Sequence, residues 1–148
     1  MKITDTVLLY APNGSKRALR MKPAIVRTGA KIKMVTNEQF GMGIGELLGF
    51  SAEEIDEIAS SAIVTDESAG HDVQQNPEEL AQLSNLKEEV LVLWNFTSPK
   101  IDGMLSNFRK AGVSKVDLKA IVTPNNIKWT FAQLIRELQR EHEAYQQL

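Results

Sequence analysis

The chain has 148 residues, of which 43% are apolar, with a formal net charge of −2 and no cysteine. This size and apolar content are enough for one hydrophobic core, so we expect a single domain over residues 1–148. The lack of cysteine excludes disulfides, thiolate zinc sites, iron–sulfur clusters and cysteine nucleophiles.

No apolar run approaches the roughly 18 residues that a membrane-spanning helix needs. The first residues, MKITDTVLLYAP, lack the apolar core and the cleavage site of a signal peptide. We therefore expect a cytoplasmic protein without a membrane partner.

Charge is distributed unevenly along the chain. Residues 1–36 hold eight Lys or Arg and one acidic residue, whereas residues 37–100 hold two Lys or Arg and thirteen acidic residues. Such a split is explained by self-neutralisation or plain solvation, or alternatively by binding of nucleic acid. The basic residues concerned are Lys16, Arg17, Arg20, Lys22, Arg27, Lys31 and Lys33.

The first elements read as strand, helix and strand. TVLLYA (6–11) is a short apolar run that a turn follows, and Ser15 can cap a helix that ends near Thr28 at Gly29. Pro23 lacks an amide hydrogen, so we expect a kink or a break of the helix there. KIKMVT (31–36) is the second expected strand.

Three alternate glycines follow in TNEQFGMGIGELLGF (36–50). A dinucleotide-binding fingerprint needs a third glycine where Glu46 stands, and no P-loop motif occurs. The favoured interpretation is that Gly43 caps a short helix with Glu46 as its partner. The alternative is close approach of a ligand or another chain to the glycine backbone.

An acidic connector (51–87) separates this half from the next. Ser51 and Glu54 have the spacing of a capping box and predict a short helix. Residues from about 60 to 75 are small, polar and acidic, which indicates an exposed connector, and a helix is expected to restart near Asn76.

The second half repeats the same order of elements. EVLVLWNF (89–96) predicts a strand, and Ser98 is the expected cap of a helix that has Pro99 in its first position and ends at Gly112. KVDLKAIVT (115–123) predicts the fourth strand. A C-terminal helix is expected from about Thr130, with Gln133 completing a capping box, to Gln146.

The two halves align with each other. Val7, Met21 and Gly29 match Val90, Met104 and Gly112 at a displacement of 83 residues, and Thr36 and Leu47 match Thr123 and Leu134 at 87. This indicates a tandem β-α-β-α duplication, with halves of about 4–50 and 88–146. The expected fold is α/β: a four-stranded, largely parallel or mixed sheet with helices packed on it.

The stretch LKAIVTPNNIKWTFAQLIRELQREHE (118–143), preceded by VLVLWNF and a helix that ends in FRKAGV, resembles the bacterial family called domain of unknown function 3783. Its Thr-Pro-Asn-x-x-x-Trp core is the most specific part, and the resemblance is best over residues 88–143. The first half, with Phe40 and GIGELLG, looks like the N-terminal segment of that family. The resemblance implies an α/β architecture and no reaction.

The candidate binding site consists of the two matching strand-end loops. Ligands of α/β sheets gather outside the carboxyl ends of parallel strands, beside helix N-termini. The alternative is that these residues only form turns and caps. The expected binding residues are Thr36, Asn37, Glu38, Gln39, Thr123, Pro124, Asn125, Asn126, Lys128 and Trp129.

Three functions compete. The first is a non-catalytic binding or regulatory module for a small polar or anionic ligand or a protein partner, with a homodimer as a further option. The second is a nucleic-acid binder that uses the basic helix. The third is an enzyme that uses Glu38 and Lys128. No catalytic set, metal site or cofactor motif stands out, so we expect no catalytic residues, metal ligands or cofactor.

Overall fold

The computed structural model describes residues 4–12, 15–61, 86–113 and 116–146. The chain forms two compact units. The sheet unit comprises Lys2–Val35 and Lys87–Ile121, and the loop unit comprises Thr36–Leu86 and Val122–Leu148. Each unit thus takes one segment from each half of the chain. A single domain over residues 1–148 was expected. That expectation depends on how the two units are joined, so it stays a prediction.

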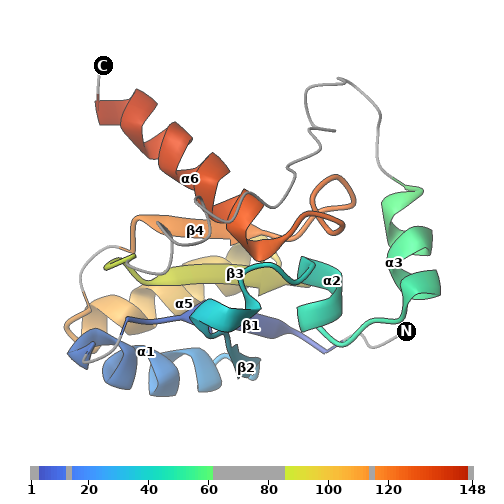
Figure 1. Ribbon diagram of the computed structural model, residues 1–148. Helices are drawn as coiled ribbons and strands as arrows, with labels where there is room; N and C mark the ends of the chain where they lie inside the picture. Colours follow the sequence, from blue (N-terminus) through green and yellow to red (C-terminus); the bar gives the residue numbers. More distant parts are fainter. Residues whose placement is uncertain (1–3, 13–14, 62–85, 114–115, 147–148) are drawn as a thin grey trace. The chain divides into compact units, whose positions relative to one another are not determined.

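The sheet unit contains a four-stranded mixed sheet in the order β2-β1-β3-β4 (Figure 1). Its strands are β1 (Thr6–Tyr10), β2 (Lys31–Met34), β3 (Val90–Trp94) and β4 (Leu118–Ile121). β1 is parallel to β2 and β3 is parallel to β4, whereas β1 and β3 are antiparallel. The α/β class and the mixed sheet are therefore confirmed.

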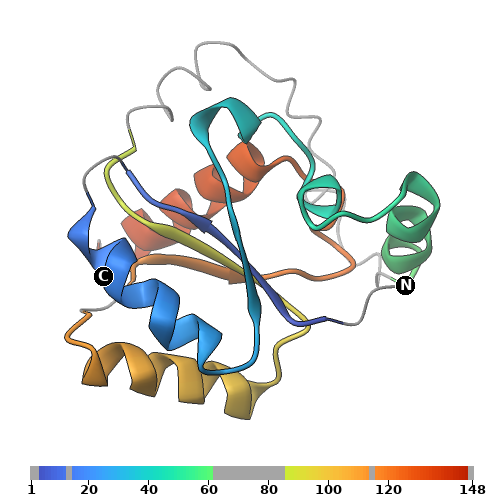
Figure 2. The same cartoon turned by 90° about the horizontal axis from the view of Figure 1, so that it is seen from below.

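Two crossover helices cover one face of this sheet. α1 (Lys16–Val26) connects β1 to β2, α5 (Ser98–Lys110) connects β3 to β4, and the two helices lie side by side (Figure 2). Because alternate strand residues share a face, the helices bury every second residue of β1 and β3. The core includes Val7, Leu9, Leu91 and Leu93 from the strands with Met21, Ala24, Ile25, Met104 and Phe108 from the helices.

The two expected outcomes at Pro23 were a kink or a break, and a break is wrong. α1 continues through Pro23 to Val26. Proline removes the hydrogen bond that its nitrogen would donate to the carbonyl of Leu19. Pro23 is exposed and Leu19 is 69% exposed, so water can satisfy that carbonyl while Met21 and Ile25 hold the helix on the sheet.

The cap of α5 lies one residue before the expected one. Thr97, not Ser98, is the N-cap, because its Oγ1 accepts a hydrogen bond from the backbone N–H of Lys100 at 3.4 Å. Ser98 is the first helical residue and Pro99 the second, where a missing N–H still costs nothing. The expected stops are confirmed, since Gly29 and Gly112 adopt positive φ angles of 90° and 78°.

The loop unit holds the remaining described elements. They are the 3₁₀ turn η1 (Asn37–Gln39), α2 (Ile44–Leu47), α3 (Ala52–Ala59) and α6 (Phe131–Gln146). The capping boxes predicted at Ser51/Glu54 and Thr130/Gln133 are both present. Most of the expected connector, and the helix expected near Asn76, lie outside the described residues. None of the described helices is long and apolar enough to cross a membrane.

The strand pairing follows the correspondence between the halves. Leu8 pairs with Val92 and Leu9 pairs with Leu91 in the antiparallel β1–β3 ladder. At a displacement of 83 residues, Leu8 corresponds to Leu91 and Leu9 corresponds to Val92, so the two pairs are images of each other. This local pseudo-twofold relation is what a duplication would produce, and the duplication itself stays a prediction.

Candidate functional site

The two predicted loops are joined by backbone hydrogen bonds inside the loop unit. The N–H of Ile44 donates to Trp129 O at 2.9 Å, and the N–H of Phe131 donates to Met42 O at 3.0 Å. These bonds flank an antiparallel bridge between Gly43 and Thr130. The segments that follow the two groups of candidate residues therefore lie against each other.

A second pair of bonds extends this contact. The N–H of Gly45 donates to Ile127 O at 3.1 Å, and the N–H of Ala132 donates to Phe40 O at 2.9 Å. Adding 87 to a residue number in the first loop gives the corresponding residue of the second loop. Under this correspondence, the bond donated by Ile44 matches the bond donated by Phe131, and the bond donated by Gly45 matches the bond donated by Ala132. The contact is therefore locally symmetric.

Each loop is stabilised internally by a threonine and an amide three residues later. The N–H of Thr36 donates to Gln39 Oε1 at 2.9 Å, and the N–H of Thr123 donates to Asn126 Oδ1 at 2.8 Å. Asn126 is buried, and its own N–H donates to Thr123 Oγ1 at 3.2 Å. These four candidate residues thus have structural roles, because they fix the loop backbone before each following helix.

Gly43 is the N-cap of α2, with the extended φ and ψ angles of −69° and 148°, as the favoured interpretation predicted. A Cβ on this residue would lie 3.3 Å from Glu46 Oε1. Another glycine has the tighter position. A Cβ on Gly45 would lie 2.6 Å from Ile55 Cγ1 and 3.3 Å from Ile127 Cγ1, so the protein's own side chains occupy the space beside this backbone.

Several of the candidate residues in the two loops are exposed. Asn37, Glu38, Asn125 and Lys128 are exposed, while Pro124 and Trp129 are half-buried. Lys128 Nζ forms an ion pair with Asp56 Oδ1 of α3 at 2.8 Å, and both side chains are more than half exposed. Lys128 is thus paired with a carboxylate other than Glu38, and neither Glu38 nor Lys128 is enclosed as a general acid or base usually is.

The apolar contact between the two loops was not predicted from the sequence. The rings of Phe40 and Phe131 lie 5.6 Å apart between centroids, and both side chains are buried. Asp56 was also missed, because it stands in an acidic segment where no spacing distinguishes one carboxylate from the next. The available signal for the ring pair was that each phenylalanine lies close to a predicted cap, Phe40 three residues before Gly43 and Phe131 directly after Thr130.

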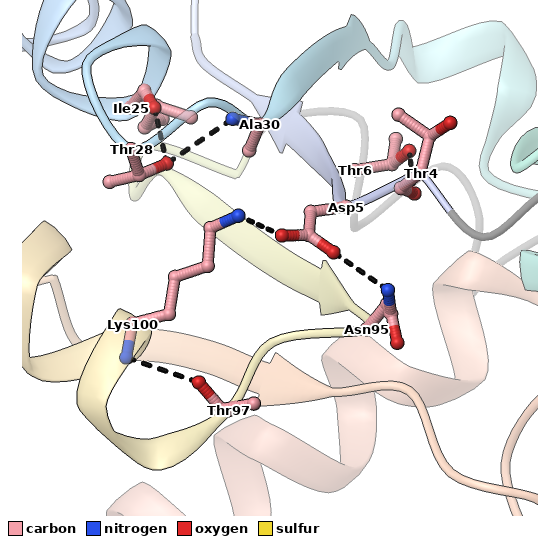
Figure 3. Close-up of polar contacts among 9 residues, drawn as sticks. All are labelled: Thr4, Asp5, Thr6, Ile25, Thr28, Ala30, Asn95, Thr97 and Lys100. Carbon is pink, nitrogen blue, oxygen red and sulfur yellow. Dashed lines mark hydrogen bonds and ion pairs between the residues drawn. The ribbon is translucent and has the colours of Figure 1, made fainter.

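A polar cluster in the sheet unit was not predicted either (Figure 3). Asp5 forms an ion pair with Lys100 and accepts a 2.7 Å hydrogen bond from Asn95 Nδ2. Asn95 has a left-handed φ of 65°, and Lys100 Nζ lies 5.4 Å from the ring centroid of Phe96. The charges of Asp5 and Lys100 offset each other. The contacts of Asp5 join the end of β3 and the start of α5 to the residue before β1.

The basic residues of the first half lie mainly on the surface of the sheet unit. Lys16, Arg20, Arg27, Lys31 and Lys33 are exposed. Arg17 instead forms a 3.4 Å ion pair with the buried Glu89. Lys22, the remaining residue of the predicted basic set, is half-buried. The acidic stretch around residues 66–79 lies outside the described residues. Within the described ranges, no three His, Asp or Glu side chains group together as metal ligands would.

Comparison with known proteins agrees with the resemblance in the second half. The model of the family described as Domain of unknown function (DUF3783) matches residues 89–145. The match starts at Glu89, so the resemblance expected for the first half stays a prediction. No curated protein and no solved structure matches the sequence. Over the segment from β3 into α6, the chain therefore has the sequence pattern of DUF3783.

Proposed function

We propose that this protein is a non-catalytic binding module whose paired loops, 36–43 and 123–130, bind a partner protein. The observation that carries the proposal is the backbone pairing of the two loops around Gly43 and Thr130. Because of this pairing, two loops that are far apart in sequence are held side by side. Each loop carries exposed polar residues.

Some loop residues stabilise the loop backbone and others are exposed to solvent, and this arrangement supports binding rather than catalysis. Gln39 and Asn126 hold their own loops, whereas Glu38 and Asn125 are exposed to solvent. Met42, 37% exposed, and the half-buried Trp129 add apolar surface. Small-molecule sites enclose most of their ligand, while protein interfaces combine exposed polar groups with a few aromatic and methionine side chains. The exposed loops match the second description.

The test is site-specific photo-crosslinking in cells. A photoreactive amino acid replaces Asn125 in one variant and Glu141, an exposed residue of α6, in the control. We expect a discrete adduct from position 125 that is absent from position 141. Glu38→Lys in the same protein should abolish the adduct while the melting temperature stays unchanged.

A parallel thermal-shift screen of the purified protein against polar and anionic metabolites tests the small-molecule alternative. A shift that Glu38→Lys abolishes, without any adduct, would keep the loops as the site and replace the protein partner with a small ligand. Equal adducts from positions 125 and 141 together with no thermal shift would overturn the proposal.

A further inference from the structure

The outer edge of β2 forms a second exposed surface, in the sheet unit. It shares no residue with the paired loops. Among the described strands, β2 lies at the end of the order β2-β1-β3-β4 and pairs only with β1. The N–H of Lys31 donates to Asp5 O and the N–H of Val35 donates to Leu9 O, both at 2.9 Å. By the alternation of a parallel ladder, the backbone groups of Ile32 and Met34 point away from β1.

The side chains of β2 divide between two faces. Ile32 and Met34 align with Val7 and Leu9, which face the helices, so they share the helix-covered face. Met34 is nevertheless 43% exposed. Lys31 and Lys33 belong to the opposite face, and both are exposed. The edge thus presents an apolar row on one face and a cationic row on the other.

α1 carries a separate apolar stripe. Leu19, Pro23 and Val26 are exposed and share one side of the helix, with Leu19 at 69% and Val26 at 59% exposure. A helix turns about 100° per residue, so this stripe lies roughly opposite Met21 and Ile25, which pack in the core. The stripe therefore points away from the sheet and does not continue the apolar row of β2.

The positive charge of this region favours an acidic partner. The segment from Ala11 to Asn37 contains seven Lys or Arg residues and no Asp or Glu. A second copy of the chain would place Lys31 and Lys33 opposite each other if two β2 edges paired, and like charges in that position are destabilising. Nucleic acid would match the cations but would use neither the exposed Met34 side chain nor the outward backbone groups.

We propose that the β2 edge binds an extended segment of a partner protein in which apolar and acidic residues alternate. The segment adds to β2 as a further strand through main-chain hydrogen bonds with Ile32 and Met34. Its apolar side chains lie on the face of the Ile32 and Met34 side chains. Its acidic side chains lie on the face of Lys31 and Lys33.

The test uses a fluorescent synthetic peptide that alternates glutamate and valine, with fluorescence anisotropy as the measurement. Controls are a scrambled peptide of the same composition and a peptide that is N-methylated at alternate residues, which removes half of its backbone donors. We expect at least tenfold weaker binding for the scrambled peptide and for the peptide methylated in the donor register.

Charge exchange in the protein tests the cationic face. Lys31→Glu/Lys33→Glu should weaken the glutamate peptide at least tenfold and should bind a peptide that alternates lysine and valine. The matched control is Lys87→Glu/Lys110→Glu, which makes the same charge change at two exposed positions elsewhere in the sheet unit and should leave the affinity within about twofold. Circular dichroism checks that each variant is folded.

The proposal is overturned if scrambled and methylated peptides bind as well as the alternating one, since attraction of charge alone would then explain the binding. It is also overturned if only an oligonucleotide binds, or if no peptide binds at millimolar concentration. Because the probe and the variants avoid the loops, each of these results leaves the proposed function of the loops standing.

Discussion

Gly43 and Thr130 form an antiparallel bridge although they lie 87 positions apart in the sequence. Gly43 caps α2, and Thr130 precedes α6 and forms the capping box of that helix with Gln133. The same positions that start the two helices therefore also join the two loops. A change at this contact should affect both loops at once.

Gly45→Ala should destabilise the loop unit. The new methyl group would lie 2.6 Å from Ile55 Cγ1 and 2.8 Å from Ile55 Cδ1, and such overpacking costs about 1–3 kcal/mol. Urea denaturation of the purified variant measures the loss. The matched control is Gly103→Ala within α5, where an added Cβ has no neighbour within 4 Å, and which should raise stability by about 0.5–1 kcal/mol. Equal effects of the two changes would contradict this account.

Asn95→Ala should be less stable than Asn95→Gly. Both variants lose the hydrogen bond to Asp5, but only alanine carries the cost of the left-handed φ of 65°. That cost is about 1–2 kcal/mol for a residue with a Cβ. Thermal unfolding of the two variants side by side isolates the backbone contribution. Indistinguishable stabilities would mean that this strand end relaxes out of the left-handed region.

Ser15 and Glu89 should show coupled effects on stability. Ser15 caps α1 by accepting from the N–H of Ala18, and its hydroxyl donates to Glu89 Oε2 at 3.1 Å. Ser15→Ala should cost about 1 kcal/mol. In a double-mutant cycle with Glu89→Ala, the two losses should fall short of additivity by about 0.5–1 kcal/mol. Fully additive losses would show that the hydroxyl caps α1 without help from Glu89.

Acid should weaken the start of α3. The N–H of Ser51 donates to Glu54 at 2.9 Å, and this bond lowers the pKa of the Glu54 carboxyl below its ordinary value. A lowered pKa means that the stabilising contribution is present above the ordinary pKa of about 4.5 and is lost as the pH falls through the folded value. NMR titration of the side-chain carboxyl measures that pKa.

The control for this titration is a neighbouring carboxylate on the same helix. Glu54→Gln should reduce the loss of stability between about pH 5 and pH 3. Glu53→Gln removes another first-turn carboxylate that is not the capping partner, and it should reduce that loss less. A larger effect of Glu53→Gln would point to the helix dipole rather than to the capping bond.

Local sequence patterns were sufficient for most of the secondary structure. The apolar runs that became β1 and β3, the glycines at positions 29 and 112, and the capping boxes at Ser51 and Thr130 each act over a few residues. The cap of α5 was displaced by one residue because Thr97 and Ser98 both have a suitable hydroxyl. The helix does not break at Pro23, because the burial of Met21 and Ile25 against the sheet outweighs one missing hydrogen bond.

The sequence by itself determined the α/β class, the order of the elements and the two loops that match each other, because these depend on periodicity and on short-range capping. Only the tertiary structure decided which groups meet. The partner of Lys128 is Asp56, the partner of Asp5 is Lys100, and Gly45 lies against Ile55 and Ile127. Contacts of this kind join distant segments, and no local preference selects one carboxylate or one isoleucine from several of the same type.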